Sequence, residues 1–450
     1  MSISLPSHSA LLKTNFTFGV ATAAFQIEGA NQLDGRIESI WDRFCATPGK
    51  VFNGDDGAIA CDHYHKWQED IELIKSLGVD AYRLSIAWPR LMDKEGKANP
   101  KGIAFYRNLL TQLKANQIKT FVTLYHWDLP QHLEERGGWL NRETAYKFQA
   151  YAQLAAEQLG QWVDVWTTFN EPWCTSILGY GEGIHAPGLA DPIKARQAGH
   201  HVLLAHGLAM PILKKVCPDA QAGIVLNMSK AYPADNKASS KMASLYAEAL
   251  DNHFFIEPLL TGQYPDVIKA LSPELIPQIE DGDMAIISQP IDYLGLNYYT
   301  CNHAKWHPEQ KRQTVLKPAT KVEYTHIGWE VNPESLTQLL LELNQEYALP
   351  PIYITENGAA CDDKLVEGEV HDEQRVRYLN AHLNAIHNAI EAGVNIQGYF
   401  AWSLMDNFEW AEGYSKRFGL VYVDYNTQER TLKASAKAYR ELLLSRLSVR

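Results

Sequence analysis

The sequence predicts an α/β fold, specifically a single (β/α)₈ (TIM) barrel with elaborated βα loops. Eight short β-rich runs occur along the 450 residues, and amphipathic helical stretches separate them. Alternating strand and helix units imply a parallel sheet, and eight such units suit a closed barrel. The competing doubly wound fold lacks support, because the glycines at 179, 181 and 183 miss the third spacing of its phosphate-binding fingerprint.

The first half of the chain supplies four strands and three helices. The predicted strands are 16–21, 82–86, 120–124 and 163–169, the last with alternating apolar residues. Apolar residues between Trp67 and Leu77 recur on one helix face that Gly78 closes, and a second face runs from Ile103 to Leu113. A third helix is predicted over 143–159.

The second half repeats the pattern. Its predicted strands are 223–227, 291–297, 352–355 and 396–401. Leucines from Leu336 to Leu343 mark a helix before the seventh strand, and a longer helix over 373–392 precedes the eighth. With no linker-like segment, residues 1–450 are expected to form one catalytic barrel domain.

Composition narrows the class of protein. A net charge of −12 disfavours nucleic-acid or anionic-membrane partners, because phosphates would repel the chain. The six cysteines show no CxxC pair or zinc-like spacing, which indicates reduced core residues. The first 13 residues lack the pattern of a signal peptide, and no apolar run could span a bilayer. These features predict a cytoplasmic protein; they do not predict an oligomeric state.

Two carboxylates follow predicted strands. Glu171 ends the run Thr-Phe-Asn-Glu after the fourth strand, and Glu356 ends Ile-Thr-Glu after the seventh. The carboxyl ends of barrel strands carry the chemistry, so both are candidate catalytic groups; structural caps of following helices are the alternative, and position alone leaves both open. Arg83, inside the second strand, needs a buried acidic partner.

The motifs Thr-Phe-Asn-Glu-Pro and Ile-Thr-Glu-Asn-Gly, in this order, resemble those of glycoside hydrolase family 1. The resemblance extends over nearly the whole chain, from the Phe-Gly-Val-Ala-Thr-Ala-Ala-Phe-Gln run at residue 18 to Tyr422. It implies a retaining β-glycosidase that acts on small β-glucosides or oligosaccharides, and on β-fucosides or β-galactosides as further substrates.

The resemblance also implies the catalytic roles. Glu356 is expected to be the nucleophile and Glu171 the general acid/base, with the carboxyls about 5–5.5 Å apart. Ionising both carboxylates at so short a distance costs free energy, because like charges repel, so the pKa of one should rise. The family places Arg83 and Tyr299 beside the nucleophile, and Asn297 belongs to the same catalytic set; neighbouring Tyr298 is expected to pack.

The remaining predicted site residues would bind the substrate. The first sugar ring is assigned to polar and aromatic groups near strand ends, on the same resemblance: Gln26, His126, Trp127, Asn170, Trp402, Glu409 and Trp410. The aglycone entrance is assigned to Trp173, Leu178, His185, Trp329 and Phe418.

Three other functions stay open. A 6-phospho-β-glucosidase is disfavoured because Glu409 would set an anion against the phosphate, while Lys416 and Arg417 are interpreted as ordinary surface charge. A thioglucosidase is disfavoured because the acid/base position is Glu171 and not a neutral amide. A sugar-binding protein without activity would be expected to lack a carboxylate, and both are present. No cofactor or metal is expected, since glycoside cleavage by two carboxylates needs none.

Overall fold

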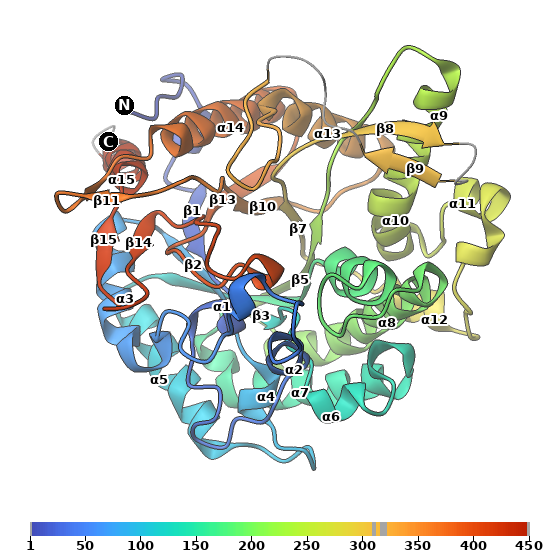
Figure 1. Cartoon of the computed structure of the whole chain (residues 1–450), viewed down its shortest axis with the longest axis horizontal. Coiled ribbons are helices and arrows are strands. Elements are labelled where there is room, and N and C mark those ends of the chain that lie inside the picture. The colour runs from blue at the N-terminus through green and yellow to red at the C-terminus, as the bar shows by residue number, and fades with distance from the viewer. Residues whose placement is uncertain (1, 308–311, 316–321, 448–450) are drawn as a thin grey trace.

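The computed structural model is a closed barrel of eight parallel strands. It describes residues 2–307, 312–315 and 322–447. The strands run around the barrel in the order β1, β13, β10, β7, β5, β4, β3, β2 (Figure 1). Their bounds are β1 Thr17–Ala21, β2 Ala81–Ser85, β3 Lys119–Tyr125, β4 Val165–Asn170, β5 Gln221–Asn227, β7 Tyr293–Asn297, β10 Ile352–Asn357 and β13 Ile396–Trp402. All eight predicted strands are therefore confirmed, with ends shifted by a few residues at most.

Helices surround the barrel, as the apolar stripes predict. The principal ones are α3 His63–Leu77, α5 Pro100–Ala115, α7 Glu143–Leu159, α8 Pro192–Val216, α13 Pro333–Glu346, α14 Glu373–Glu391 and α15 Ala434–Leu447. In Figure 1, α15 lies between α14 and α3 at the position where the ring of helices closes. Gly78 ends α3 at φ +71°, a left-handed conformation that glycine adopts without a Cβ penalty.

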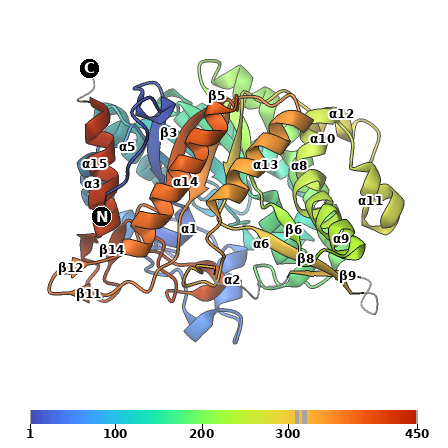
Figure 2. The same cartoon turned by 90° about the horizontal axis from the view of Figure 1, so that it is seen from above.

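The segment between β5 and β7 is the longest elaboration of the barrel. It holds β6 Ala231–Pro233, α9 Ala238–Glu248, α10 Phe254–Thr261, α11 Asp266–Leu271 and α12 Asp283–Ile287. Strand β6 pairs with β8 Asn302–His307, which pairs with β9 Arg312–Val315. In Figure 2 this small sheet lies on the same lower side of the molecule as α2 Ile40–Cys45.

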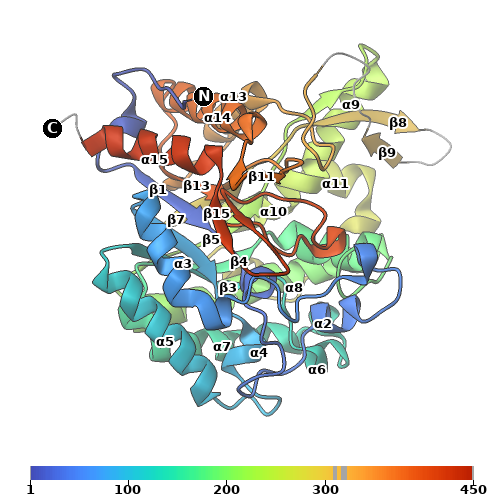
Figure 3. The same ribbon diagram turned by 60° about the vertical axis from the view of Figure 1, so that its left-hand side comes forward.

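The remaining βα loops carry short elements. Two hairpins follow β10 and β13, namely β11 Leu365–Val366 with β12 Glu369–Val370 and β14 Val421–Val423 with β15 Arg430–Leu432, and Figure 3 shows β15 beneath α15. The short helices are α1 Ala24–Ile27, α4 Trp88–Leu91 and α6 Gln131–Glu134. Among the described residues, no helix is long and apolar enough to cross a membrane.

The barrel interior is packed with large side chains. Phe121, Tyr293, Tyr353 and Phe400 are buried there, and Phe121 contacts both Tyr353 and Phe400. All six cysteines are buried and unpaired, as the sequence predicts. A filled interior leaves the carboxyl ends of the strands as the place for chemistry.

Candidate active site

Strand register brings the predicted catalytic residues to one level of the barrel. Glu356 of β10 pairs with Asn297 of β7, and Arg83 of β2 pairs with Ala21 of β1. Glu171 follows β4 directly with φ +52°, and its backbone N–H donates to Val225. A left-handed conformation costs a non-glycine residue about 1–2 kcal/mol, and here it turns the carboxyl into the site.

Glu356 is buried between a cation and a phenol. Its Oε1 accepts from Arg83 Nη1 at 2.6 Å, and its Oε2 accepts from the Tyr299 hydroxyl at 2.6 Å. Burial raises the pKa of Glu356, while the Arg83 charge and the Tyr299 hydroxyl lower it. The buried partner that Arg83 required is therefore Glu356.

Glu171 contacts no cation among the residues that the structure describes. Its Oε1 accepts from Asn297 Nδ2 at 2.6 Å, and its Oε2 accepts from Cys174 Sγ at 3.0 Å. Burial, together with the neighbouring Glu356 carboxylate, raises the pKa of Glu171 to about 7. Near neutral pH this group therefore holds a proton in a large fraction of molecules.

Asn170 connects the two carboxyls. Its Oδ1 accepts from Arg83 Nη2 at 2.6 Å and from Asn297 Nδ2 at 3.0 Å. With that oxygen occupied, Nδ2 faces His126 Nε2 at 3.1 Å and must donate to it, which leaves the imidazole proton on Nδ1. Burial lowers the pKa of His126 far below its usual value, so the ring is neutral.

A cavity of about 470 Å³ opens onto both carboxyl groups. Aromatic side chains form much of its wall, and Trp410 stacks on His126, which also stacks on Trp402. No lysine or arginine is among the described residues that line it. The predicted site residues that line it are Glu171, Glu356, Asn297, Tyr299, His126, Trp127, Trp402, Glu409, Trp410, Phe418, Trp173, Leu178, His185 and Trp329.

Three predicted site residues lie behind this wall. Arg83 contacts Glu356 directly, and Asn170 joins Arg83 to Asn297. Gln26 is fully buried and donates to Asn407 Oδ1 at 3.0 Å and to the Phe408 carbonyl at 2.8 Å, which leaves its Oε1 without a protein partner. Such an unpaired buried acceptor is suited to a ligand hydroxyl.

Glu409 differs from the sequence-based expectation. Its Oε2 is buried without a partner, and burial, reinforced by Glu356 and Glu171, raises its pKa to about 8. The prediction of an anion at this position is therefore wrong near neutral pH, because three buried carboxyls cannot all ionise beside one arginine. A protonated Glu409 can both donate and accept a hydrogen bond.

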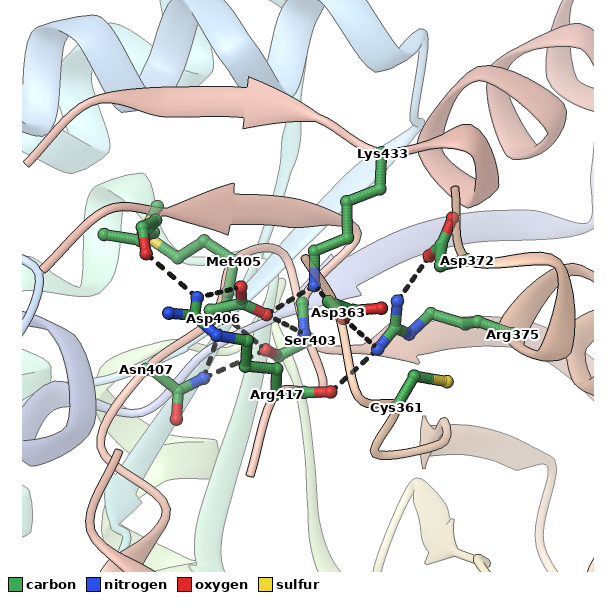
Figure 4. Close-up of polar contacts among 12 residues, drawn as sticks. Cys361, Asp363, Asp372, Arg375, Ser403, Met405, Asp406, Asn407, Arg417 and Lys433 are labelled. Carbon is green, nitrogen blue, oxygen red and sulfur yellow. Dashed lines mark hydrogen bonds and ion pairs between the residues drawn. The ribbon is translucent and has the colours of Figure 1, made fainter. Parts of the chain in front are cut away.

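The interpretation of Arg417 as ordinary surface charge is also wrong. Its Nη1 donates to buried Asp406 at 2.6 Å, and its guanidinium lies 4.1 Å from the Tyr422 ring centroid. Figure 4 shows Arg417 within a chain of buried ion pairs that continues through Lys433 and Arg375. Lys416 is half-buried, and among the described residues its Nζ donates to the His326 carbonyl.

The ion-pair network supports the active-site loop. Asp406 and Asn407 belong to the segment that joins Trp402 to Glu409. Asn407 Nδ2 donates to Ser403 Oγ and to the Met405 carbonyl, both at 2.9 Å (Figure 4), while its Oδ1 accepts from Gln26. These contacts fix the position of the aromatic and polar groups that the loop carries.

The sequence analysis missed several residues at the site, among them Asn227 and Cys174. Asn227, the last residue of β5, lines the cavity with an unpaired Oδ1. Its place at the carboxyl end of a strand was the available signal. Cys174 begins a π-helical segment, Cys174–Glu182, and contacts Glu171. Nothing in the sequence pattern indicated that contact. Tyr298 packs as predicted, with its hydroxyl 2.6 Å from the Asn332 carbonyl.

Known proteins resemble the chain along its whole length. The family model "Glycosyl hydrolase family 1" matches residues 8–446. Beta-glucosidase A of Thermotoga maritima is 45% identical, covering 94% of this chain and 96% of that protein. The bifunctional beta-D-glucosidase/beta-D-fucosidase of Bifidobacterium breve is 43% identical, with coverage of 95% and 97%. The solved structure of the GH1 beta-glucosidase from Exiguobacterium antarcticum superimposes with a TM-score of 0.94 at 43% identity, covering 100% of this chain and 99% of that one.

Proposed function

The chain belongs to glycosyl hydrolase family 1, and from this premise we propose that it hydrolyses terminal, non-reducing β-D-glucosyl residues with retention of configuration. β-Glucosides and cello-oligosaccharides are the proposed substrates, with β-fucosides in addition, as the name of the Bifidobacterium relative suggests. One observation carries the proposal. Two buried carboxyls share one site, and among the described residues a cation pairs with Glu356 but not with Glu171.

The pairing with Arg83 supports the roles that we propose for the two carboxyls in the first step. Arg83 and Tyr299 favour the ionised form of Glu356, which attacks the anomeric carbon as nucleophile. Glu171 holds its proton and gives it to the departing glycosidic oxygen. The bond from carbon to the leaving oxygen breaks as the bond to Glu356 forms, so the product is a glycosyl-enzyme and a free alcohol.

The second step reverses the proton transfer. Once Glu356 is esterified its negative charge is gone, so the pKa of Glu171 falls and the ionised group can accept a proton from water. The water attacks the same carbon and releases Glu356. Two displacements at one centre return the original configuration.

The fixed orientation of Asn297 places the reactive proton. Asn297 Oδ1 accepts from Thr355 Oγ1 at 2.7 Å, so Nδ2 always faces Glu171 Oε1 as a donor. Oε1 therefore remains an acceptor, and the acid proton resides on Oε2, the oxygen that Cys174 contacts. The thiol can donate to Oε2 when Glu171 is ionised and accept from it weakly when Glu171 is protonated.

The cavity wall supplies the sugar contacts. On the wall, polar atoms of Glu409 and Asn227 that have no partner among the described residues are the proposed partners of sugar hydroxyls, and the Trp402 and Trp410 rings are proposed to pack against the sugar. Gln26, which lies behind the wall, is proposed as a further partner through its Oε1. Trp173, Leu178, His185, Trp329 and Phe418 are proposed to contact the leaving group. We further propose one catalytic domain over the whole chain and, from six unpaired buried cysteines, a cytoplasmic location.

Phosphorylated substrates do not suit this cavity. A 6-phosphate would enter a site with three buried carboxyls and no lysine or arginine among the described lining residues. Of the two basic residues that follow the Glu409 loop, Arg417 is paired with Asp406, and Lys416 donates to the His326 carbonyl. The presence of Glu171 likewise disfavours a thioglucosidase, and turnover of any glycoside would eliminate a purely sugar-binding role.

The test compares kcat/KM for an aryl β-D-glucoside with that for the same compound phosphorylated at the 6-hydroxyl. We expect a strong preference for the neutral glucoside, with the β-anomer of glucose as the first product. Preference for the phosphorylated compound would overturn the substrate assignment, and an α-anomer as first product would overturn the retaining mechanism.

A further inference from the structure

A cysteine, a histidine and a glutamate meet behind the wall of the cavity. Cys301 and His303 stand two residues apart at the start of β8, and Glu330 comes from the loop before α13. His303 Nε2 lies 2.9 Å from Glu330 Oε2 and 3.9 Å from Cys301 Sγ, and all three ligand atoms lie within 4.8 Å of one another. Cys301 and Glu330 are buried, and His303 is 20% exposed.

This donor set fits a zinc-class ion. Thiolate, imidazole and carboxylate bind Zn²⁺ at about 2.3, 2.0–2.1 and 2.0–2.2 Å, so ligand atoms around a tetrahedral ion lie roughly 3.3–3.6 Å apart. The distance of 2.9 Å between His303 and Glu330 is shorter than that range, and the distance of 3.9 Å between Cys301 and His303 is longer. Small side-chain rotations of His303 and Glu330 would open the cluster for an ion, with no change of backbone.

One amide orients two of the three donors. Asn332 Nδ2 donates to Glu330 Oε1 at 3.0 Å and to Cys301 Sγ at 3.4 Å. The amide cannot turn over freely, because its Oδ1 accepts from the backbone N–H of Ser335 at the start of α13. The sulfur therefore already accepts a hydrogen bond, and outer partners of this kind hold the ligands of metal sites in place.

We propose that Cys301, His303 and Glu330 form a binding site for a zinc-class divalent cation, with water as a fourth ligand on the exposed side of His303. Binding moves the Cys301 thiol proton to solvent and leaves a thiolate–metal bond, with no change of oxidation state.

The proposed site adjoins the active site without being part of it. Thr300 and Asn302, on either side of Cys301, line the cavity, as does Trp329 beside Glu330. Tyr299, which contacts Glu356, is two residues before Cys301. A bound ion would thus tie together the two segments that carry Tyr299 and Trp329. The binding proposal does not depend on the proposed glycosidase activity.

Cobalt(II) is the probe, because a cysteine thiolate bound to it gives a charge-transfer absorption band in the near ultraviolet. The full-length protein is first freed of metal with a chelator. We expect the band to grow as Co²⁺ is added, up to one equivalent per chain, and to disappear when Zn²⁺ displaces the Co²⁺. Cys301→Ala should lose the band. His303→Gln should weaken Co²⁺ binding at least about tenfold, since loss of even an outer-shell partner costs 10–100-fold.

The matched control is the other His-containing cluster. His8, His387 and Glu391 could also gather around an ion, but they include no thiol. His387→Ala should therefore leave the band and its titration unchanged. Absence of the band in the unmodified chain, or an unchanged band in Cys301→Ala, would overturn the proposal. Because His303 is partly exposed, His303→Gln should fold even if Cys301→Ala does not, and unchanged Co²⁺ affinity in that variant would overturn the proposal equally.

Discussion

Two groups of buried carboxyls lie near the end of β13, and they differ in how many cations accompany them. Asp363, Asp372 and Asp406 are paired with Lys433, Arg375 and Arg417 (Figure 4). In the active site, Glu356 is paired with Arg83, and within the described part of the chain no cation pairs with Glu171 or Glu409. All of these carboxyl residues are buried except Glu409, which is half-buried.

The pKa shifts of Asp363, Glu171 and Glu409 follow the cations beside each group. Burial alone would raise the pKa of Asp363, but Arg375 and Lys433 hold it below the ordinary value. The pKa of Glu171 rises to about 7 and that of Glu409 to about 8, because burial and neighbouring carboxylates act there without an adjacent cation. The aspartate group therefore holds the active-site loop in a fixed position, and the glutamate group keeps protons available for catalysis.

The largest effect should come from removing the one charge-paired carboxylate of the active site. Glu356→Ala leaves Arg83 and Tyr299 without the group that attacks carbon, so turnover should fall by more than the about 10⁴-fold expected for loss of a general acid. Added azide should enter the vacated space and restore activity, with a glucosyl azide of inverted configuration. An azide product of retained configuration would contradict the assignment of Glu356 as nucleophile.

Removing a cation from the ion-pair network of Asp363 and Asp406 should lower the free energy of unfolding. Lys433→Met leaves Asp363 and Asp406 facing each other without their shared cation, which should cost about 3–5 kcal/mol in the free energy of unfolding. Urea unfolding measures this. The matched control is Lys437→Met, an exposed lysine four residues later that pairs with Glu369 and should cost less than about 1 kcal/mol. Equal losses of unfolding free energy in the two variants would show that the buried network contributes no more stability than an exposed ion pair.

A smaller effect is expected from the thiol beside the acid. Cys174 donates to ionised Glu171, so Cys174→Ala should raise the pKa of Glu171 above about 7. The alkaline limb of kcat/KM should then move to higher pH by less than about one unit, because a thiol is a weak donor. Cys217→Ala removes a buried thiol that contacts Ala156 and should leave the limb in place. A shift of the limb to lower pH in Cys174→Ala would contradict the contact.

The sequence predicted the barrel because each strand is short, apolar and bounded by breakers. It did not predict α8 Pro192–Val216, whose buried residues surround the helix and leave no clear apolar stripe. The active-site carboxyls were predictable from strand ends and motifs. The unequal distribution of cations was not, because Arg417, Lys433 and Arg375 reach the network from three separate segments of the chain.

The central claim is that Glu171 holds the proton that the leaving group receives. The most direct test is kcat/KM against pH for an aryl β-D-glucoside with a poor leaving group, in the unmodified protein and in Glu171→Ala. Because the raised pKa of Glu171 is about 7, activity of the unmodified protein should fall as pH rises through that value. In Glu171→Ala this limb should disappear, with a rate lower by about 10²–10⁴-fold. Persistence of the same limb in the variant would show that another group supplies the proton.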